Sequence, residues 1–265
     1  MANCAYKDKE RTKLIYADEA TDKDAIYYCP NKECTAHMQL CSLDGERKRY
    51  FSAKKSNHKH IENCIYYKSN INFNRNDYDE DQFDFEEAIK SMLNMEKQEK
   101  SDRTDSKNDN KTSEGSNKKL PIHTILQIYS MCKELKHTEM YANHLVSSML
   151  LDDRSVDCYI DRYEGIFLIE AKPKSYLYHK TLPEIYLSAP INNKEYSIVL
   201  NFDDEKLYKD LRSDLFDNIE NVVILSGIWH RDVDDNTYKT KITTKKQIRI
   251  LNKKKKHKKK HKKKQ

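Results

Sequence analysis

YYCPNKEC (residues 27–34) and RYFSAKKSNHKHIENC (residues 49–64) decide the fold of the N-terminal part of this chain. Together they hold four candidate metal ligands in two pairs: Cys29 and Cys34, then His60 and Cys64. Three thiolates and one imidazole form a ligand set typical of tetrahedral Zn²⁺. The spacing of four residues within the second pair puts both side chains on one face of a helical turn. The two stretches therefore predict a small zinc-binding module.

Neighbouring residues leave the ligand set open. His58 could take the place of His60, and Cys41 or His37 could take the place of Cys34. Only one of the two imidazoles in the SNHKH run is expected to point inward with the last cysteine.

The segment between the two ligand pairs, residues 35–59, is long enough for a small hairpin. Asp44 and Gly45 lie inside it, between two strand-like runs, and Asp-Gly is a strong hairpin-turn signal. On the N-terminal side, Pro30 favours a turn that folds both thiolates towards one point. The module is expected to reach from about residue 13 to residue 67.

IYADEA (residues 15–20), followed by the two ligand-bearing stretches, resembles the zinc-finger-like N-terminus of competence-protein-CoiA-like bacterial proteins. In that pattern a Cys pair is followed by an aromatic strand and then by a His and a Cys. This chain has four residues between the first two cysteines where the family pattern has two. The resemblance covers about a fifth of the chain, and it implies a module that precedes DNA-processing domains, often nuclease-like ones.

The charge of the chain is unevenly distributed. It has 49 basic and 43 acidic residues, a net charge of +6, but ten lysines lie in the last thirteen residues, KKKKHKKKHKKKQ. Without these ten lysines, 39 basic residues face the 43 acidic ones, and the net charge is −4. A block of like charges stays solvated, and counterion release gives it affinity for any nucleic acid without sequence preference. A purely solubilising tail is the alternative.

Several observations bear on the cellular compartment. No apolar run approaches the roughly 18 residues that a membrane span needs. The N-terminus, MANCAYKDKERTK, lacks the apolar core of a signal peptide. Seven cysteines, an odd number, beside a metal motif are typical of a reducing compartment. We therefore expect a cytoplasmic protein without a membrane partner.

Composition divides the chain into four segments: a zinc module with a short helix (1–96), a disordered linker (97–119), an OB-like domain with a leading helix (120–251) and a poly-Lys tail (252–265). The linker is predicted to be disordered because it contains no apolar residue. The short helix has an apolar stripe that is expected to dock on the zinc module, formed by Phe85, Ile89, Met92 and Leu93.

The third segment predicts an α+β domain. A helix over residues 121–136 comes first, and strand-like runs follow at 158–161, 165–172, 184–189, 196–202, 221–230 and 239–251. A second helix, residues 206–216, lies between the third and fourth of the last five runs, which we interpret as a five-stranded antiparallel set. This order resembles that of the OB-fold. Gly165 and Gly227 are expected where the strands of a small barrel bend.

An OB-like barrel binds unpaired nucleic-acid strands through stacking aromatic side chains and a cationic groove. The candidate nucleic-acid-binding residues are Tyr176, Tyr178, Tyr186, Trp229, Arg231 and Lys245, with Lys172, Lys174 and His230 nearby. Trp229 is expected at the mouth of the barrel. The resulting hypothesis is a zinc-containing protein that binds nucleic acid, single strands in preference to duplexes.

Two alternatives remain. The stretch around Glu170-Ala171-Lys172 resembles the core of PD-(D/E)xK nucleases, which implies that Asp157 or Asp161 would bind Mg²⁺ together with Glu170, and that Lys172 would orient the attacking water. Against this, Pro173 follows at once where the nuclease fold needs a helix. The other alternative is a protein–protein interaction module that does not bind nucleic acid.

Overall fold

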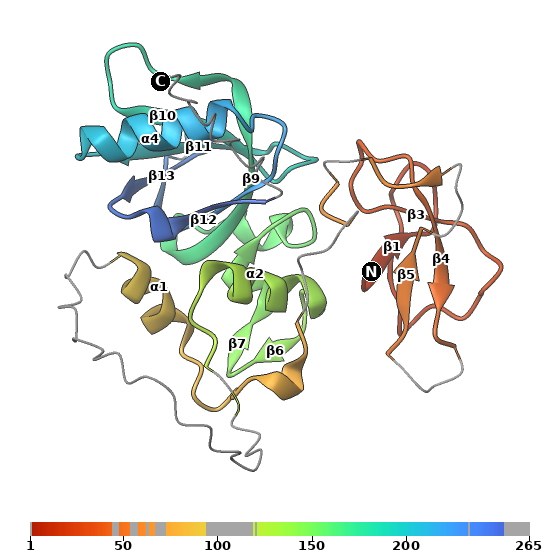
Figure 1. Cartoon of the computed structure of the whole chain (residues 1–265). Helices are drawn as coiled ribbons and strands as arrows, with labels where there is room; N and C mark the ends of the chain where they lie inside the picture. Colours follow the sequence, from red (N-terminus) through yellow and green to blue (C-terminus); the bar gives the residue numbers. More distant parts are fainter. Residues whose placement is uncertain are drawn as a thin grey trace, which may run out of the picture.

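The computed structural model describes residues 2–43, 48–53, 58–61, 64–66, 73–93, 119, 121–232 and 234–251. Three predicted features lie outside these residues: the Asp44–Gly45 turn, the linker except for its last residue, and the Lys-rich tail. The described part is a mixed α and β structure, as predicted. An N-terminal sheet lies beside a group of short helices and a closed β-barrel (Figure 1).

The N-terminal sheet has five short strands in the order β2-β1-β3-β4-β5. They are β1 (Cys4–Tyr6), β2 (Leu14–Tyr16), β3 (Tyr27–Tyr28), β4 (His37–Cys41) and β5 (Tyr50–Ser52). All neighbours in it are antiparallel, and β4 pairs with β5 so that Leu40 lies opposite Phe51. The hairpin predicted between the two ligand pairs is therefore present.

The helical part lies below the barrel in Figure 1 and holds α1 (Phe85–Leu93), α2 (Ile125–Glu134), α3 (Val146–Met149) and a hairpin of β6 (Met140–Tyr141) and β7 (His144–Leu145). The start of α2 is fixed by a capping box: Gln127 N donates to Thr124 Oγ1, and Thr124 N donates to Gln127 Oε1. Such reciprocal bonds satisfy two backbone donors that the first turn leaves open.

The helix α1 packs against the barrel. The hydroxyl groups of Thr243 and Thr244, which follow the last barrel strand, donate to the carbonyl oxygens of Leu93 and Met92 at 2.8 and 2.6 Å. The prediction that the apolar stripe of this helix docks on the zinc module is therefore wrong. A stripe shows which face of a helix is buried, but not which part of the chain covers it.

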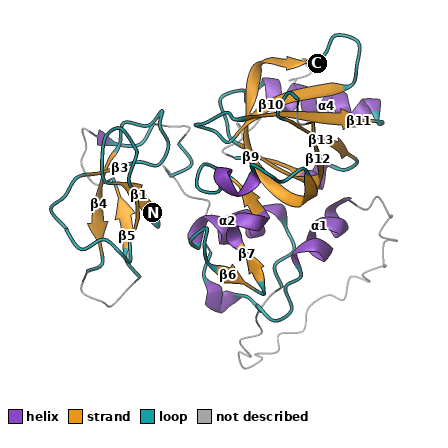
Figure 2. Cartoon of the chain, turned by 180° about the vertical axis from the view of Figure 1, so that it is seen from behind, coloured by secondary structure: helices purple, strands orange, loops and turns teal. Residues whose placement is uncertain are grey.

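The barrel contains five strands and one helix: β9 (Glu164–Tyr178), β10 (Glu184–Ala189), β11 (Tyr196–Phe202), α4 (Glu205–Phe216), β12 (Val223–Asp232) and β13 (Thr237–Ile242). Their order around the barrel is β9-β10-β11-β13-β12, and β12 pairs again with β9 to close it. The long β9 makes closure possible, because its first half pairs with β12 and its second half with β10. Figure 2 shows the same barrel from behind.

Four details differ from the predicted strands. The pairing of β11 with β13 is parallel, whereas the prediction has only antiparallel neighbours. The run at 158–161 is not a strand, since Val156–Tyr159 form a 3₁₀ turn. The last run divides into β13 and the short β14 (Ile248–Ile250), which pairs with the first residues of β12, whereas β13 pairs with its last three. The short β8 (Leu150–Leu151) adds a parallel neighbour to β9.

Both predicted glycine positions have a steric reason. Gly165 has a φ of +143°, which side chains rarely allow, at the start of β9. A Cβ atom on Gly227 would lie 2.6 Å from Thr240 Oγ1, so β12 and β13 can approach each other closely only with glycine there. None of the helices in the described part of the chain is long and apolar enough to span a bilayer.

Candidate metal centre and nucleic-acid face

The four predicted ligands meet in one cluster. One donor atom from each of Cys29, Cys34, His60 and Cys64 lies within 4.8 Å of all the others. The Sγ atoms of Cys29 and Cys64 are 3.6 Å apart, and His60 Nδ1 is 3.4 Å from Cys34 Sγ and 3.5 Å from Cys64 Sγ. A tetrahedron with Zn–S bonds of about 2.3 Å has edges of about 3.8 Å. The cluster therefore has the size and the donors for a metal ion such as zinc.

The alternative ligands lie elsewhere. The ring of His58 stacks on that of His37, with centroids 3.8 Å apart, and Cys41 Sγ lies 3.5 Å from the carbonyl oxygen of Gln39. The sequence offers two histidines two residues apart, and the structure directs His60 to the thiols.

Two features near the cluster concern its backbone and the ionisation of its thiols. Arg11 orients the backbone around it: Nε donates to the carbonyl oxygen of Cys29 at 3.0 Å, and Nη2 donates to that of Cys34 at 2.6 Å. Hydrogen bonds from the neighbouring thiols lower the pKa of Cys34, whereas burial raises the pKa of Cys29. Without a metal the cluster thus favours one thiolate over three, and a divalent cation supplies the charge that allows all three thiols to ionise.

The turn between the first two ligands docks on the barrel. Asn192, in the β10–β11 loop, donates from Nδ2 to the carbonyl oxygen of Pro30 at 3.3 Å and accepts from Lys32 N at 2.9 Å. Next to it, Lys172 Nζ on β9 lies 2.6 Å from Glu33 Oε2. The ligand-bearing turn and the barrel therefore contact each other directly, although they are far apart in the sequence.

A group of buried charges lies under this contact. Lys133 Nζ on α2 is 2.9 Å from Asp152 Oδ2 and 3.0 Å from Glu170 Oε2, and Tyr129 donates its hydroxyl to Glu170 Oε2 at 2.5 Å. Arg154 Nη2 lies 2.8 Å from Asp152 Oδ2. Burial alone would raise the pKa of Asp152, but Arg154 and Lys133 lower it below its usual range. Each of the two buried carboxylates thus lies next to a cation that compensates its charge.

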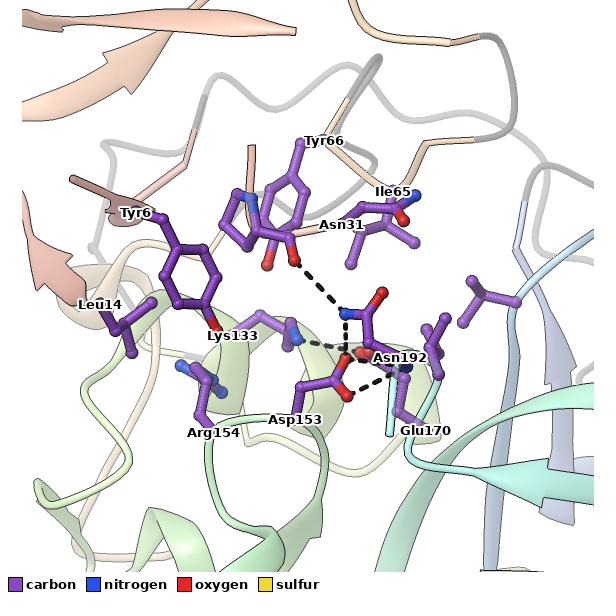
Figure 3. Close-up of a pocket in the computed structure, with 13 residues that line it drawn as sticks. Tyr6, Leu14, Asn31, Ile65, Tyr66, Lys133, Asp153, Arg154, Glu170 and Asn192 are labelled. Atoms are coloured by element: carbon purple, nitrogen blue, oxygen red, sulfur yellow. Dashed lines mark hydrogen bonds and ion pairs between the residues drawn. The ribbon is translucent and has the colours of Figure 1, made fainter. Parts of the chain in front are cut away.

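A cavity of about 20 Å³, enough for one water molecule, lies between this group and the N-terminal module (Figure 3). Its labelled lining residues come from both sides: Tyr6, Leu14, Asn31, Ile65 and Tyr66 from the module, and Lys133, Asp153, Arg154, Glu170 and Asn192 from the rest of the chain. Burial raises the pKa of Asp153 to about 6, and the neighbouring carboxylates add to this effect. Asp153 accepts hydrogen bonds from Asn192 N and Nδ2.

The residues of the nuclease alternative do not form an open site. Asp157 is exposed in the 3₁₀ turn before β9, whereas the Glu170 side chain is only 2% exposed and is bound by Tyr129 and Lys133. From the sequence, an OB-like barrel is expected to place Glu170 on its surface or in a groove, and the structure shows that this expectation is wrong. The strand β9 also continues through Pro173, so no helix follows directly after Lys172.

Three of the predicted nucleic-acid-binding residues gather on the outside of the barrel. Tyr176 is 60% exposed and stacks on Tyr186, with ring centroids 5.4 Å apart and an angle of 12° between the planes. Tyr178 is 39% exposed, and the guanidinium group of Arg212 on α4 lies 4.8 Å from the centre of its ring. Arg212 was not among the predicted residues, because only the fold brings α4 to the end of β9.

Two of the other predicted residues differ from expectation. Trp229 is fully buried and donates from Nε1 to the carbonyl oxygen of Phe167 at 2.9 Å, so its expected place at the barrel mouth is wrong. Its position two residues after Gly227 on β12 points its side chain into the barrel. Arg231 donates to the carbonyl oxygens of Tyr159 and Ile160, which commits its guanidinium group to the fold.

Lys245 remains an exposed lysine and a candidate. Its Nζ atom lies 2.7 Å from Asp210 Oδ2 on α4, and its side chain is 59% exposed. Exposed ion pairs contribute little and exchange easily.

Sequence reasoning missed the buried charges. A signal was present: Lys133 follows Ile125 and Tyr129 at intervals of four, so a lysine continues the apolar stripe of α2. A charge on a buried stripe needs a partner of opposite charge.

Comparisons of the chain with protein-family models, with curated proteins and with solved structures give no match. Inferences about its function therefore start from the metal cluster and the barrel surface.

Proposed function

We propose that this chain is a zinc-containing nucleic-acid-binding protein that prefers single strands to duplexes and serves as an adaptor in bacterial or mobile-element DNA processing. The observation that carries the binding part is the closed barrel with its exposed tyrosines. The strand order β9-β10-β11-β13-β12, with α4 between the third and fourth strands, supports an OB-like assignment. Barrels of this kind bind oligonucleotides on the face of their second and third strands and on adjacent loops.

The chemistry of that surface supports single strands. An exposed aromatic ring can stack on any unpaired base, whereas the bases of a duplex are already stacked on one another. Tyr176, Tyr178 and Tyr186 lie at or near the loop between the first two barrel strands, which is one of the loops that OB-like barrels use. The lysine-rich tail would add affinity that is independent of sequence and strand number.

The role that we assign to zinc is structural. Three cysteines and one histidine fill all four positions of a tetrahedral site, and closed sites of this type hold folds together, whereas catalytic sites keep a position for water. The metal would fix the turn at residues 29–34, which contacts the barrel through Asn192. The zinc module thus supports the barrel rather than carrying out chemistry.

The test compares binding of the full chain to four labelled probes of equal length: single-stranded DNA, single-stranded RNA and the two duplexes. Single strands are expected to bind more tightly than duplexes, and the difference is expected to persist at higher salt, where the contribution of the tail declines. Equal affinity for single strands and duplexes at all salt concentrations would contradict the proposal. No binding to any probe would favour the alternative of a protein–protein interaction module.

A further inference from the structure

The tyrosines of the barrel surface lie in a row that also contains cations. Cross-strand register places Tyr186 on β10 opposite Val199 on β11, and Val199 opposite Lys239 on β13. Side chains directly opposite each other in neighbouring strands lie on the same face of a sheet. Since Tyr176 stacks on Tyr186, the row runs from the end of β9 across three further strands to Lys239.

A second row lies beside the first. Glu184 is opposite Asn201, and Asn201 is opposite Lys241. Lys239 and Lys241 are 47% and 56% exposed and are paired with Asp232 and Asp203 at the surface. Because such exposed pairs are worth little, phosphate groups can replace the carboxylates at a small cost. The far end of both rows is therefore cationic. The near end of the first row is aromatic, and the near end of the second is Glu184, which accepts a hydrogen bond from the Tyr186 hydroxyl at 2.5 Å.

As far as the structure describes the chain, the helices of the helical part pack mainly on strands other than β10, β11 and β13. The helices α1, α2 and α3 pack against β9, β12 and β14. The helix α4 lies at the near end of the rows and adds Arg212, whose guanidinium group lies over the rings of Tyr178 and Tyr208, 4.8 and 5.4 Å from their centres. Planar guanidinium groups stack on aromatic rings and on bases alike. The near end thus offers two stacking positions, the Tyr176–Tyr186 pair and the Tyr178–Arg212 pair.

We propose that an unpaired nucleic-acid strand crosses the barrel along these rows, with its bases on the Tyr176–Tyr186 and Tyr178–Arg212 pairs and its phosphates at Lys239 and Lys241. This inference rests on the proposed function and gives it a location. It assigns Arg212 as a binding residue and removes Trp229 and Arg231 from the site. The stacking contacts account for the preference for single strands, and the lysines account for part of the salt dependence.

The experiment measures the affinity of the full chain for short single strands of dT and rU by fluorescence anisotropy. Tyr176→Ala, Tyr186→Ala and Arg212→Ala are each expected to weaken binding by roughly tenfold, the usual size of a lost stacking contact. Tyr186→Phe keeps the ring and is expected to retain affinity. The matched control is Tyr163→Ala: Tyr163 is 49% exposed but precedes β9, at the opposite end of that strand from Tyr176, and its loss is expected to change nothing.

The lysines have a separate readout. Lys239→Gln and Lys241→Gln are each expected to reduce the slope of log affinity against log salt by about 0.7, the value for one phosphate contact on a single strand. If the variants lose affinity for dT and rU strands alike, the protein recognises bases and phosphates. If they lose affinity for only one of the two, the sugar is a further contact. If the wild type binds single strands and the three alanine variants match the Tyr163→Ala control, this location is wrong while the proposed function stands. If the wild type binds no probe, the proposed function fails first.

Discussion

Asn192 donates a hydrogen bond from its side-chain amide to the carbonyl oxygen of Pro30, a residue 162 positions earlier that directly follows the first candidate metal ligand. The same amide nitrogen donates to Asp153 Oδ2 at 2.6 Å. One side chain on the barrel thus contacts both the metal-binding turn and the part of the chain that holds the buried charges. Metal binding and docking are expected to support each other, because linkage between two equilibria is reciprocal.

Asn192→Ala is expected to lower the affinity for zinc by about fivefold, at the small end of typical coupling between sites. The variant removes the hydrogen bonds to Pro30 and Lys32 that hold the turn in its metal-binding shape. The measurement is a competition for Zn²⁺ with a chromogenic chelator. Asn193→Ala serves as the control, because the Asn193 side chain reaches only the exposed Nζ atom of Lys32. Identical affinities in the wild type and the Asn192 variant would show that the turn holds its shape without the barrel.

One zinc ion per chain is expected by elemental analysis of the purified protein. Cys64→Ser and His60→Ala should lose the metal and lower the melting temperature, since the free energy of metal binding contributes to folding in small metal-bound modules. His58→Ala is the matched control, because the His58 ring stacks on His37 and not on the thiols. Zinc retained by the His60 variant but lost by the His58 variant would reverse the ligand assignment.

Glu170→Gln is expected to destabilise the fold by about 3 kcal/mol, because it removes one partner from a buried ion pair and leaves Lys133 undercompensated. Binding to single strands is expected to stay the same, because Glu170 is buried away from the tyrosine rows. Thermal melting and anisotropy measure the two effects, with the exposed Glu195→Gln as the control. Metal-dependent cleavage of nucleic acid that is present in the wild type and absent from the Glu170 variant would instead support the nuclease alternative.

Asp153→Asn is expected to raise stability at neutral pH relative to the wild type, by at most about 3 kcal/mol. Burial raises the folded pKa of Asp153 to about 6, above the value of 3.8 for an unperturbed side chain. The folded state therefore takes up a proton between these two values, so that this group costs stability above pH 6 and the cost disappears as the pH falls towards 4. Unfolding measured for both proteins from pH 4 to 8 should show the advantage of the variant growing up to pH 6. A constant difference over this range would mean that Asp153 titrates normally.

The sequence predicts those parts of the structure that local pattern determines. The spacing of Cys29, Cys34, His60 and Cys64 is enough to identify the metal cluster, because each pair lies on a short turn. The apolar runs indicate the barrel strands along the chain, but not the parallel pairing of β11 with β13. The place of Trp229 follows only from the closure of the barrel, which turns that side of β12 inward.

The other features of the structure depend on contacts between residues that are far apart in the sequence. Lys133, Asp152 and Glu170 come from three separate elements, and no spacing in the sequence links them. The same holds for Arg212, which reaches Tyr178 only because α4 crosses the end of β9. The surface on which the apolar stripe of α1 packs likewise depends on contacts between residues far apart in the sequence, such as Leu93 and Thr243.

The central claim is that the barrel itself, and not only the cationic tail, binds unpaired strands. Its most direct test is the affinity of a chain that ends at Leu251, the last described residue, for single-stranded and double-stranded probes of equal length at moderate salt. We expect this chain to bind both probes more weakly than the full chain, with a smaller salt dependence, but to keep its preference for the single strand. Complete loss of single-strand binding would contradict the claim and assign all nucleic-acid binding to the lysine tail. Equal affinity for both probes would contradict the claim that the barrel prefers unpaired strands.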